Sequence, residues 1–171
     1  MSAEEELQEH AAHAREPFDK KVAATMAVIA ALLAIITALG HIYTTEELIN
    51  QQKASDQWSY YQAKSIRRYE SEIARDLFAA MKAEKSEAYA KNIEKYRTDG
   101  EEIQKKAKEF EDESHLRGQQ ALRLHLGEIF LEVAIVFASL AILTKRPLLY
   151  WTAVSSGAFG AAVAATTLLI H

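Results

Sequence analysis

The sequence predicts an all-α membrane protein: three transmembrane helices, with a long extramembrane antiparallel helical hairpin, a coiled-coil-like stalk, between spans one and two. Residues 22–45 and 147–170 each run for 24 residues without a charged side chain. Residues 124–144 form a third apolar run, which carries only two acids. A bilayer core about 30 Å thick is crossed by roughly 20 apolar residues in a helix, so each run is long enough to span it.

The charged residues are concentrated between the first two spans, in residues 46–123. This block holds 16 of the 24 acidic and 15 of the 20 basic residues of the chain. It is nearly neutral, so it offers no basic patch for nucleic acid. The mean hydropathy of the whole chain, -0.16, therefore hides a sharp segregation of apolar and polar segments.

The residue inventory also argues against several classes of function. The chain has no cysteine, which excludes disulfides, thiolate metal sites and cysteine nucleophiles. It has no phosphate-binding glycine loop, nucleophile elbow or zinc-protease motif. We therefore predict no enzymatic activity, no cofactor and no metal site.

The basic residues near the spans predict the orientation of the chain. They gather before span one and between spans two and three: Arg15, Lys20, Lys21, Lys145 and Arg146. The positive-inside rule places this side in the cytoplasm. Residues 1–21 are then a cytoplasmic N-terminal segment, and the hairpin and the C-terminus are extracytoplasmic. Residues 22–45 exceed the ~7 to 15 apolar residues of a signal peptide, so we expect a retained anchor.

The polar block is predicted to be helical almost throughout, because it lacks proline and is rich in strong helix formers. Asp99-Gly100 is a turn signal, but a turn there would leave arms of 52 and 23 residues. The 3/4 spacing of small and apolar positions also continues through Gly100. We therefore place the hairpin tip at residues 81–87, with Gly100 on the inner face of the descending arm.

The ascending arm carries aromatic and apolar residues at roughly helical spacing. They are Trp58, Tyr61, Ile66, Tyr69, Ile73 and Leu77. We expect these residues to form the face toward the descending arm, and we favour packing over a ligand platform.

Span two contains the acids that lie at membrane depth. Glu128 and Glu132 share a helix face with His125. A carboxylate near the bilayer centre costs about 2.5–3.5 kcal/mol, so both should face protein or water rather than lipid. Counting from the outer ends of the spans puts His41 level with His125 and Glu128, and Thr37 nearer Glu132. We predict a pair between His41 and Glu128 at the outer interface.

Two roles remain open for this intramembrane group. In the first, a hydrogen-bonded or protonated glutamate joins neighbouring helices and serves assembly. In the second, the carboxylates form a proton or cation site, or a ring that lines a pore in a homo-oligomer. The first role is favoured, because nothing else in the sequence resembles a transport pathway.

Span three is rich in small residues, which allow helices to approach closely. Its small-xxx-small pairs are Ser156 with Gly160 and Gly157 with Ala161. Packing on the other two spans and self-association both account for this pattern.

Four segments together carry a family resemblance. They are Pro17-Phe18 before span one, Thr45 to Leu48 after it, Asp56 to Arg67 in the ascending arm, and Glu132 to Val136 leading to Leu143-Thr144-Lys145-Arg146. They resemble a bacterial membrane family catalogued as a domain of unknown function, number 4337. The most specific part is the stalk segment containing Trp58, Tyr61, Gln62, Lys64 and Ile66. The resemblance implies a bacterial inner-membrane protein with a helical insertion, and it supplies no activity, substrate or catalytic residue.

Two functions of different class follow from these observations. The favoured one is a structural or interaction module, in which the three spans anchor a helical stalk that self-associates or contacts an envelope protein. The alternative is a homo-oligomeric cation channel or proton-coupled assembly that uses Glu128 and Glu132. The lipid bilayer is the partner common to both.

Overall fold

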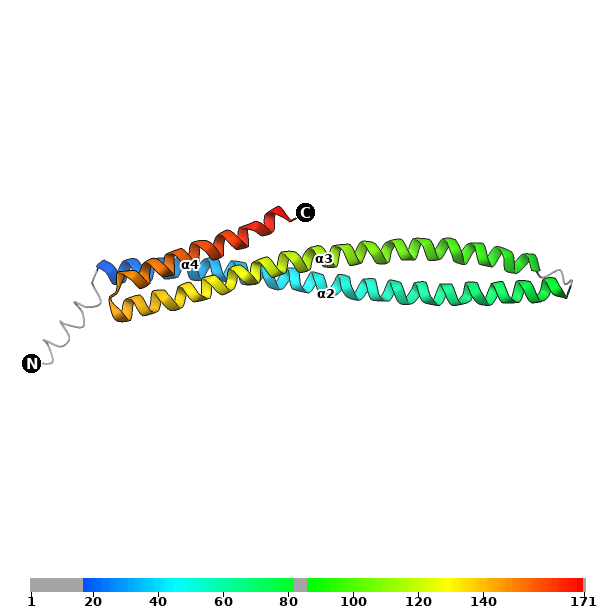
Figure 1. The fold of residues 1–171 in the computed structure, drawn as a ribbon, viewed down its shortest axis with the longest axis horizontal. Helices are drawn as coiled ribbons and strands as arrows, with labels where there is room; N and C mark the ends of the chain where they lie inside the picture. Colours follow the sequence, from blue (N-terminus) through cyan, green and yellow to red (C-terminus); the bar gives the residue numbers. More distant parts are fainter. Residues whose placement is uncertain (1–16, 82–85, 171) are drawn as a thin grey trace, which may run out of the picture. The chain divides into compact units, whose positions relative to one another are not determined.

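The chain is almost entirely helical in the computed structural model, which describes residues 17–81 and 86–170 (Figure 1). The helices are α2 (Pro17–Ala80), α3 (Ser86–Thr144) and α4 (Pro147–Ala165), followed by the short 3-10 helix η1 (Thr166–Leu169). The described ranges contain no strand. The prediction of an all-α fold is confirmed. Most of the N-terminal segment 1–21 and of the expected tip 81–87 lies outside the described residues.

Proline and backbone geometry account for two of the helix boundaries. Pro17 begins α2 and Pro147 begins α4, where the fixed φ of proline suits the first helical turn and its missing N–H costs nothing. Between α3 and α4, Lys145 has a φ of 54° and Arg146 is extended, which reverses the chain in two residues. Three helices are long and apolar enough to cross a membrane by length and composition.

The chain divides into two compact units. The three-helix unit comprises the described residues up to Thr44 and those from Gly118 onward. The two-helix unit comprises Thr45–Arg117.

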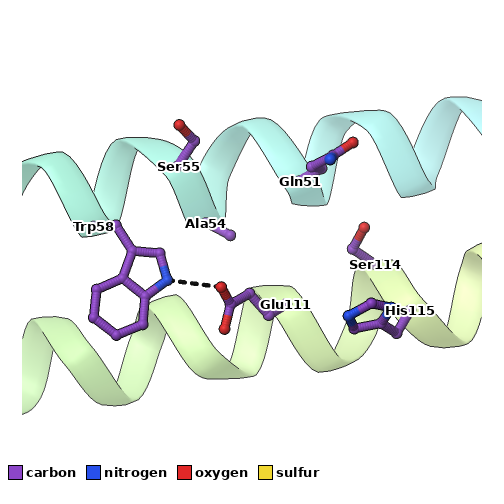
Figure 2. Close-up of a pocket in the computed structure, with 7 residues that line it drawn as sticks. All are labelled: Gln51, Ala54, Ser55, Trp58, Glu111, Ser114 and His115. Atoms are coloured by element: carbon purple, nitrogen blue, oxygen red, sulfur yellow. Dashed lines mark hydrogen bonds between the residues drawn. The ribbon is translucent and has the colours of Figure 1, made fainter.

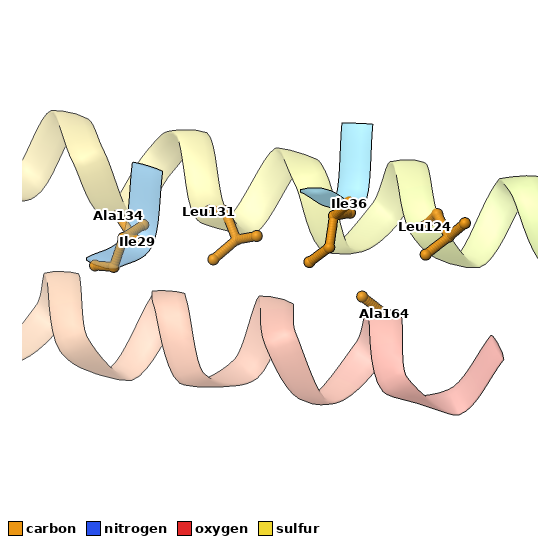
Figure 3. Close-up of a cluster of buried hydrophobic side chains, with 6 residues drawn as sticks. All are labelled: Ile29, Ile36, Leu124, Leu131, Ala134 and Ala164. Atoms are coloured by element: carbon orange, nitrogen blue, oxygen red, sulfur yellow. The ribbon is translucent and has the colours of Figure 1, made fainter. Parts of the chain in front are cut away.

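The three-helix unit has a core of aliphatic and small side chains drawn from α2, α3 and α4. One cluster consists of Ile29, Ile36, Leu124, Leu131, Ala134 and Ala164, shown in Figure 3. A second consists of Val22, Ala138, Ala141, Tyr150 and Ala153. The buried positions of α3 recur at intervals of three, four or seven residues, as expected for one face of a helix. Several of them are alanine, which lets the helices pack closely.

In the two-helix unit, segments of α2 and α3 pack against each other in antiparallel directions. The seam is built from small and aliphatic buried residues, namely Ala54, Gly100, Ile103 and Ala107. Phe78 stacks on Tyr89, with ring centroids 5.5 Å apart. Helix α3 continues without interruption through Gly100, so the prediction of no turn at this glycine is confirmed.

The prediction that six residues of α2 pack on the other arm is wrong for four of them. Trp58 and Tyr61 are partly buried, but the remaining four are 55–70% exposed. These four, which we call the apolar stripe, are Ile66, Tyr69, Ile73 and Leu77. The inner face at this level instead carries Lys64, Arg68 and Ser71, which are at most partly exposed. Lys64 has a partner across the seam in Asp99, whereas Ser71 donates to the carbonyl oxygen of Arg67 in its own helix.

The ion pair between Lys64 and Asp99 crosses this seam. Lys64 Nζ lies 2.8 Å from Asp99 Oδ2, and the Lys64 side chain is only 13% exposed. Its ammonium also lies 5.4 Å from the ring centroids of both Tyr60 and Tyr96. The hydrogen bond to Lys64 lowers the pKa of Asp99, and the same bond raises the pKa of Lys64.

These two shifts predict how stability depends on pH. The lowered pKa of Asp99 contributes stability above the ordinary carboxyl value of 3.8, which is lost as pH falls through the lowered pKa. The raised pKa of Lys64 contributes stability below 10.5, which is lost as pH rises through the raised pKa. We expect Asp99→Asn to reduce both the loss of stability at low pH and the loss of stability at high pH. Thermal unfolding followed by circular dichroism measures the two losses. Asp112→Asn, at an exposed carboxylate, is the control, and an equal effect of both variants would contradict the assignment.

Candidate functional site

A chain of polar side chains joins α2 to α3 in the three-helix unit. Thr37 on α2 donates its hydroxyl hydrogen to Glu128 Oε1 at 2.6 Å. On the other side of the carboxylate, Glu128 Oε2 lies 3.0 Å from His125 Nδ1. The other ring nitrogen, His125 Nε2, lies 3.2 Å from Thr44 Oγ1. With Nδ1 protonated, a neutral imidazole donates to Glu128 and accepts from Thr44, so the whole chain is satisfied. We call these four residues the polar chain.

Local sequence explains why the polar chain fits between the helices. The i,i+3 spacing puts His125 and Glu128 on one face of α3. Opposite them is Gly40, where an added Cβ would lie 3.1 Å from His125 Cε1. The glycine therefore leaves the space that the imidazole occupies. The Glu128 side chain is 19% exposed and that of His125 is 40% exposed.

The pairing of α2 with α3 places His41 beside His125, as expected, but it places Thr37 level with Glu128 rather than with Glu132. Thr37, expected nearer Glu132, hydrogen-bonds Glu128 instead. His41 is exposed, and its ring lies edge-on to that of His125 with centroids 6.4 Å apart. The Glu128 carboxylate is hydrogen-bonded to Thr37 of α2 and to His125 of its own helix, and His41 interacts with it electrostatically. Gly40 is the residue that sequence reasoning missed, and the available signal was that it is the one glycine in the apolar run 22–45.

Glu132 lies apart from the polar chain. Its side chain is exposed on the three-helix unit, and no hydrogen bond or ion pair joins it to any residue in the described part of the chain. The two acids of span two, which share a helix face in sequence, therefore have different surroundings. Glu128 is bonded between helices, whereas Glu132 points away from the core.

The small residues of α4 mainly serve contacts within the chain. Ser156 donates to the carbonyl oxygen of Phe130 at 2.8 Å. An added Cβ on Gly157 would lie 3.2 Å from Ile29 Cδ1. An added Cβ on Gly160 would lie 2.7 Å from the carbonyl oxygen of Gly127, so the two helix backbones nearly touch at this pair. The fourth residue, Ala161, lines an apolar groove.

The family-like stalk segment occupies the two-helix unit. Trp58 Nε1 donates to Glu111 Oε1 at 2.8 Å, as Figure 2 shows. These two residues border a cavity of about 350 Å³ that is also lined by Gln51, Ala54, Ser55, Ser114 and His115. Gln62 and Ile66 are exposed. Tyr61 lies within 3.5 Å of the Cβ that Gly100 lacks, so the aromatic ring packs over the glycine.

Across the described residues, no cluster of three or more histidine, aspartate or glutamate side chains has the arrangement to hold a metal ion. The polar chain couples α2 to α3 by hydrogen bonds. Glu132 can pair only with something outside the described chain. These are the chemical capacities of the site.

Fold and site together define a class: an all-helical protein in which three helices have the length and hydropathy of membrane spans and the longest two extend into a polar helical pair. The family model named domain of unknown function DUF4337 matches residues 18–170. The chain therefore belongs to this family, as the sequence resemblance indicated. No curated protein and no solved structure matches the chain.

Proposed function

We propose that this protein is a structural and interaction module of a bacterial inner membrane. In this proposal α2, α3 and α4 each cross the bilayer, the N-terminus and the connection at Lys145 are cytoplasmic, and the two-helix unit is extracytoplasmic. Two features support the placement: three helices of suitable length and hydropathy and basic residues gathered on one side of the spans. The unit outside the membrane is then available to another protein of the envelope.

The observation that carries the interaction role is the apolar stripe on α2. Its residues are spaced by three or four positions, the pattern of a helix that packs on another helix. They are exposed because the seam with α3 uses a different face, and Ile73 is 70% exposed. A soluble helix surface seldom keeps such a row uncovered unless it marks an interface.

A second copy of this chain is the partner that fits the stripe best. The stripe is flanked by charges of both signs, Arg67 and Glu70, which are exposed and form no ion pair within the described part of the chain. Two antiparallel or parallel copies of this face can pair each arginine with a glutamate, as flanking positions do in coiled coils. The proposed assembly is therefore a homo-oligomer held through α2.

The oligomeric state in detergent or in nanodiscs tests this proposal. We expect the wild-type protein to associate and Ile73→Glu to weaken association by about tenfold or more, because burying an isoleucine side chain contributes about 1.5–3 kcal/mol. Light scattering and cross-linking measure the change. Ile49→Glu is the control, since Ile49 is 49% exposed on the same helix but lies outside the apolar stripe. A monomeric wild type, or an equal effect of both variants, would overturn the proposal.

A second candidate function is a cation- or proton-conducting assembly, and the observation that favours it is Glu132. Its exposed carboxylate has no partner in the described chain, and a symmetric oligomer could bring several copies to one axis. This candidate predicts cation or proton flux into liposomes that is lost in Glu132→Gln. The structural proposal predicts no flux above that of empty vesicles, with Glu132→Gln changing only the oligomer size.

A further inference from the structure

We infer that the three-helix unit binds a phospholipid in the groove between α2 and α4, with its phosphate on Arg123. The groove has a volume of about 250 Å³. Its walls are almost wholly apolar: Leu32, Ile36, Leu39 and Tyr43 of α2, Leu124 of α3, and Ala161, Ala164, Ala165, Thr167 and Leu168 of α4 and η1. The inference rests on the proposed membrane placement, but it does not require self-association.

The dimensions of the groove suit one acyl chain. Leu32 and Tyr43 mark its two ends along α2, and the eleven steps between them correspond to about 16 Å of helix. Half of a bilayer core about 30 Å thick is about 15 Å. The groove therefore runs over the depth of one leaflet, and Tyr43 lies at the end where an aromatic residue would meet the headgroups.

A buried hydroxyl is the first polar feature of the groove. Thr167 lines it and is only 5% exposed. Its Oγ1 has no hydrogen-bond partner in the described chain. Leaving such a group unpaired is unfavourable, and a groove-bound ligand with an acceptor removes that cost. The ester carbonyl of a phospholipid is an acceptor that lies between the acyl chain and the phosphate, which is the order the groove requires.

The second polar feature is the cation of Arg123, which lies close to Thr167. Arg123 directly precedes the groove residue Leu124, and its Nη1 donates to Thr166 Oγ1 at 3.1 Å, next to Thr167. The guanidinium forms no ion pair with a carboxylate within the described residues. Guanidinium groups bind phosphate through paired N–H donors. Charge complementarity at the groove therefore points to a phosphodiester, with Arg123 fixing the headgroup and Thr167 the ester.

Lipid retention by the full-length protein tests the inference. The protein is reconstituted in vesicles of phosphatidylglycerol and phosphatidylethanolamine, extracted in mild detergent, and examined by native mass spectrometry. We expect about one phospholipid per chain to survive extraction. Ala161→Phe fills the groove and should abolish retention, whereas Ala162→Phe, at an exposed neighbour on the same helix, should not.

The polar contacts are tested with matched variants. Arg123→Gln and Thr167→Val should each weaken retention, by about tenfold for the arginine, which contributes charged hydrogen bonds. Arg146→Gln removes the same charge from the connection between α3 and α4 and should leave retention unchanged. A phospholipid with a photoreactive acyl chain should label residues around Ile36 in the wild type and not in Ala161→Phe.

The outcomes separate this inference from the proposed function. Failure of the protein to co-float with vesicles would overturn the membrane placement itself. A protein that floats but retains no phospholipid, or that loses it equally in Ala161→Phe and Ala162→Phe, would overturn only the lipid site. Disulfide cross-links between two Leu39→Cys chains would assign the groove to a second copy and also overturn it. A monomeric protein that retains phospholipid would support the lipid site and would contradict the proposed self-association.

Discussion

Gly160→Ala is expected to destabilise the three-helix unit by about 1–3 kcal/mol, the usual range for an overpacked contact. The added Cβ would lie 2.7 Å from the carbonyl oxygen of Gly127 and 2.9 Å from Phe130 Cβ. Neither contact is with the flexible end of a side chain, so α3 and α4 must move apart. Thermal unfolding of the full chain in detergent, followed by circular dichroism, measures the loss.

The control is the same substitution at a glycine with room beside it. Gly100 lies within α3, and an added Cβ would make an ordinary contact 3.5 Å from Tyr61. Alanine is favoured over glycine in a helix by about 0.8–1 kcal/mol, so Gly100→Ala should stabilise the two-helix unit. The opposite signs at two helical glycines isolate the effect of packing from that of helix propensity. Equal stabilisation by both variants would show that α3 and α4 do not approach closely at Gly160.

The helical content of this chain is predictable from sequence because local signals determine it. Long apolar runs, strong helix formers and the lack of proline between Pro17 and Pro147 all favour helix. Gly100 shows how a strong local turn signal can be overruled: the 3/4 spacing on both sides identified it as a seam residue. Both the turn signal and the 3/4 spacing that overrules it are present in the sequence itself.

The pairing of helix faces is less predictable because it depends on three-dimensional fit. The apolar stripe was expected at the seam because its apolar residues recur at roughly helical spacing, yet the seam uses alanine, glycine and the ion pair of Lys64 with Asp99. A two-helix pair can bury only one face of each helix. An amphipathic pattern with two apolar faces therefore leaves open which face packs within the chain.

The candidate site was predicted as a set of residues but not as an arrangement. Spacing placed His125 and Glu128 together, and they are in contact. Thr37 was expected nearer Glu132 but bonds Glu128. The space at Gly40 helps to set the pairing of α2 with α3, and counting residues from the span ends does not take such a fit into account. The exposure of Glu132 follows from the same side-chain packing, which a helical wheel of α3 alone does not contain.

Glu128→Leu is the second variant with a large expected effect, a loss of about 1–3 kcal/mol in the stability of the three-helix unit. The substitution removes the acceptor of two hydrogen bonds, from Thr37 at 2.6 Å and from His125 at 3.0 Å. Donors left without partners in apolar surroundings account for a cost of this size. Glu128→Gln keeps an acceptor for Thr37 and should cost less. Thermal unfolding in detergent provides the comparison.

Glu132→Leu is the matched control for this prediction, because it makes the same change one helical turn away. Glu132 is exposed and forms no bond within the described chain, so its replacement breaks no contact between α2, α3 and α4. In the proposed membrane placement, a leucine at this exposed position also removes the cost of a carboxylate in the bilayer. The stability of the three-helix unit should therefore be unchanged or higher. If Glu132→Leu destabilises the unit as much as Glu128→Leu does, the two glutamates share one site and the polar chain is not the separate element that its hydrogen bonds define.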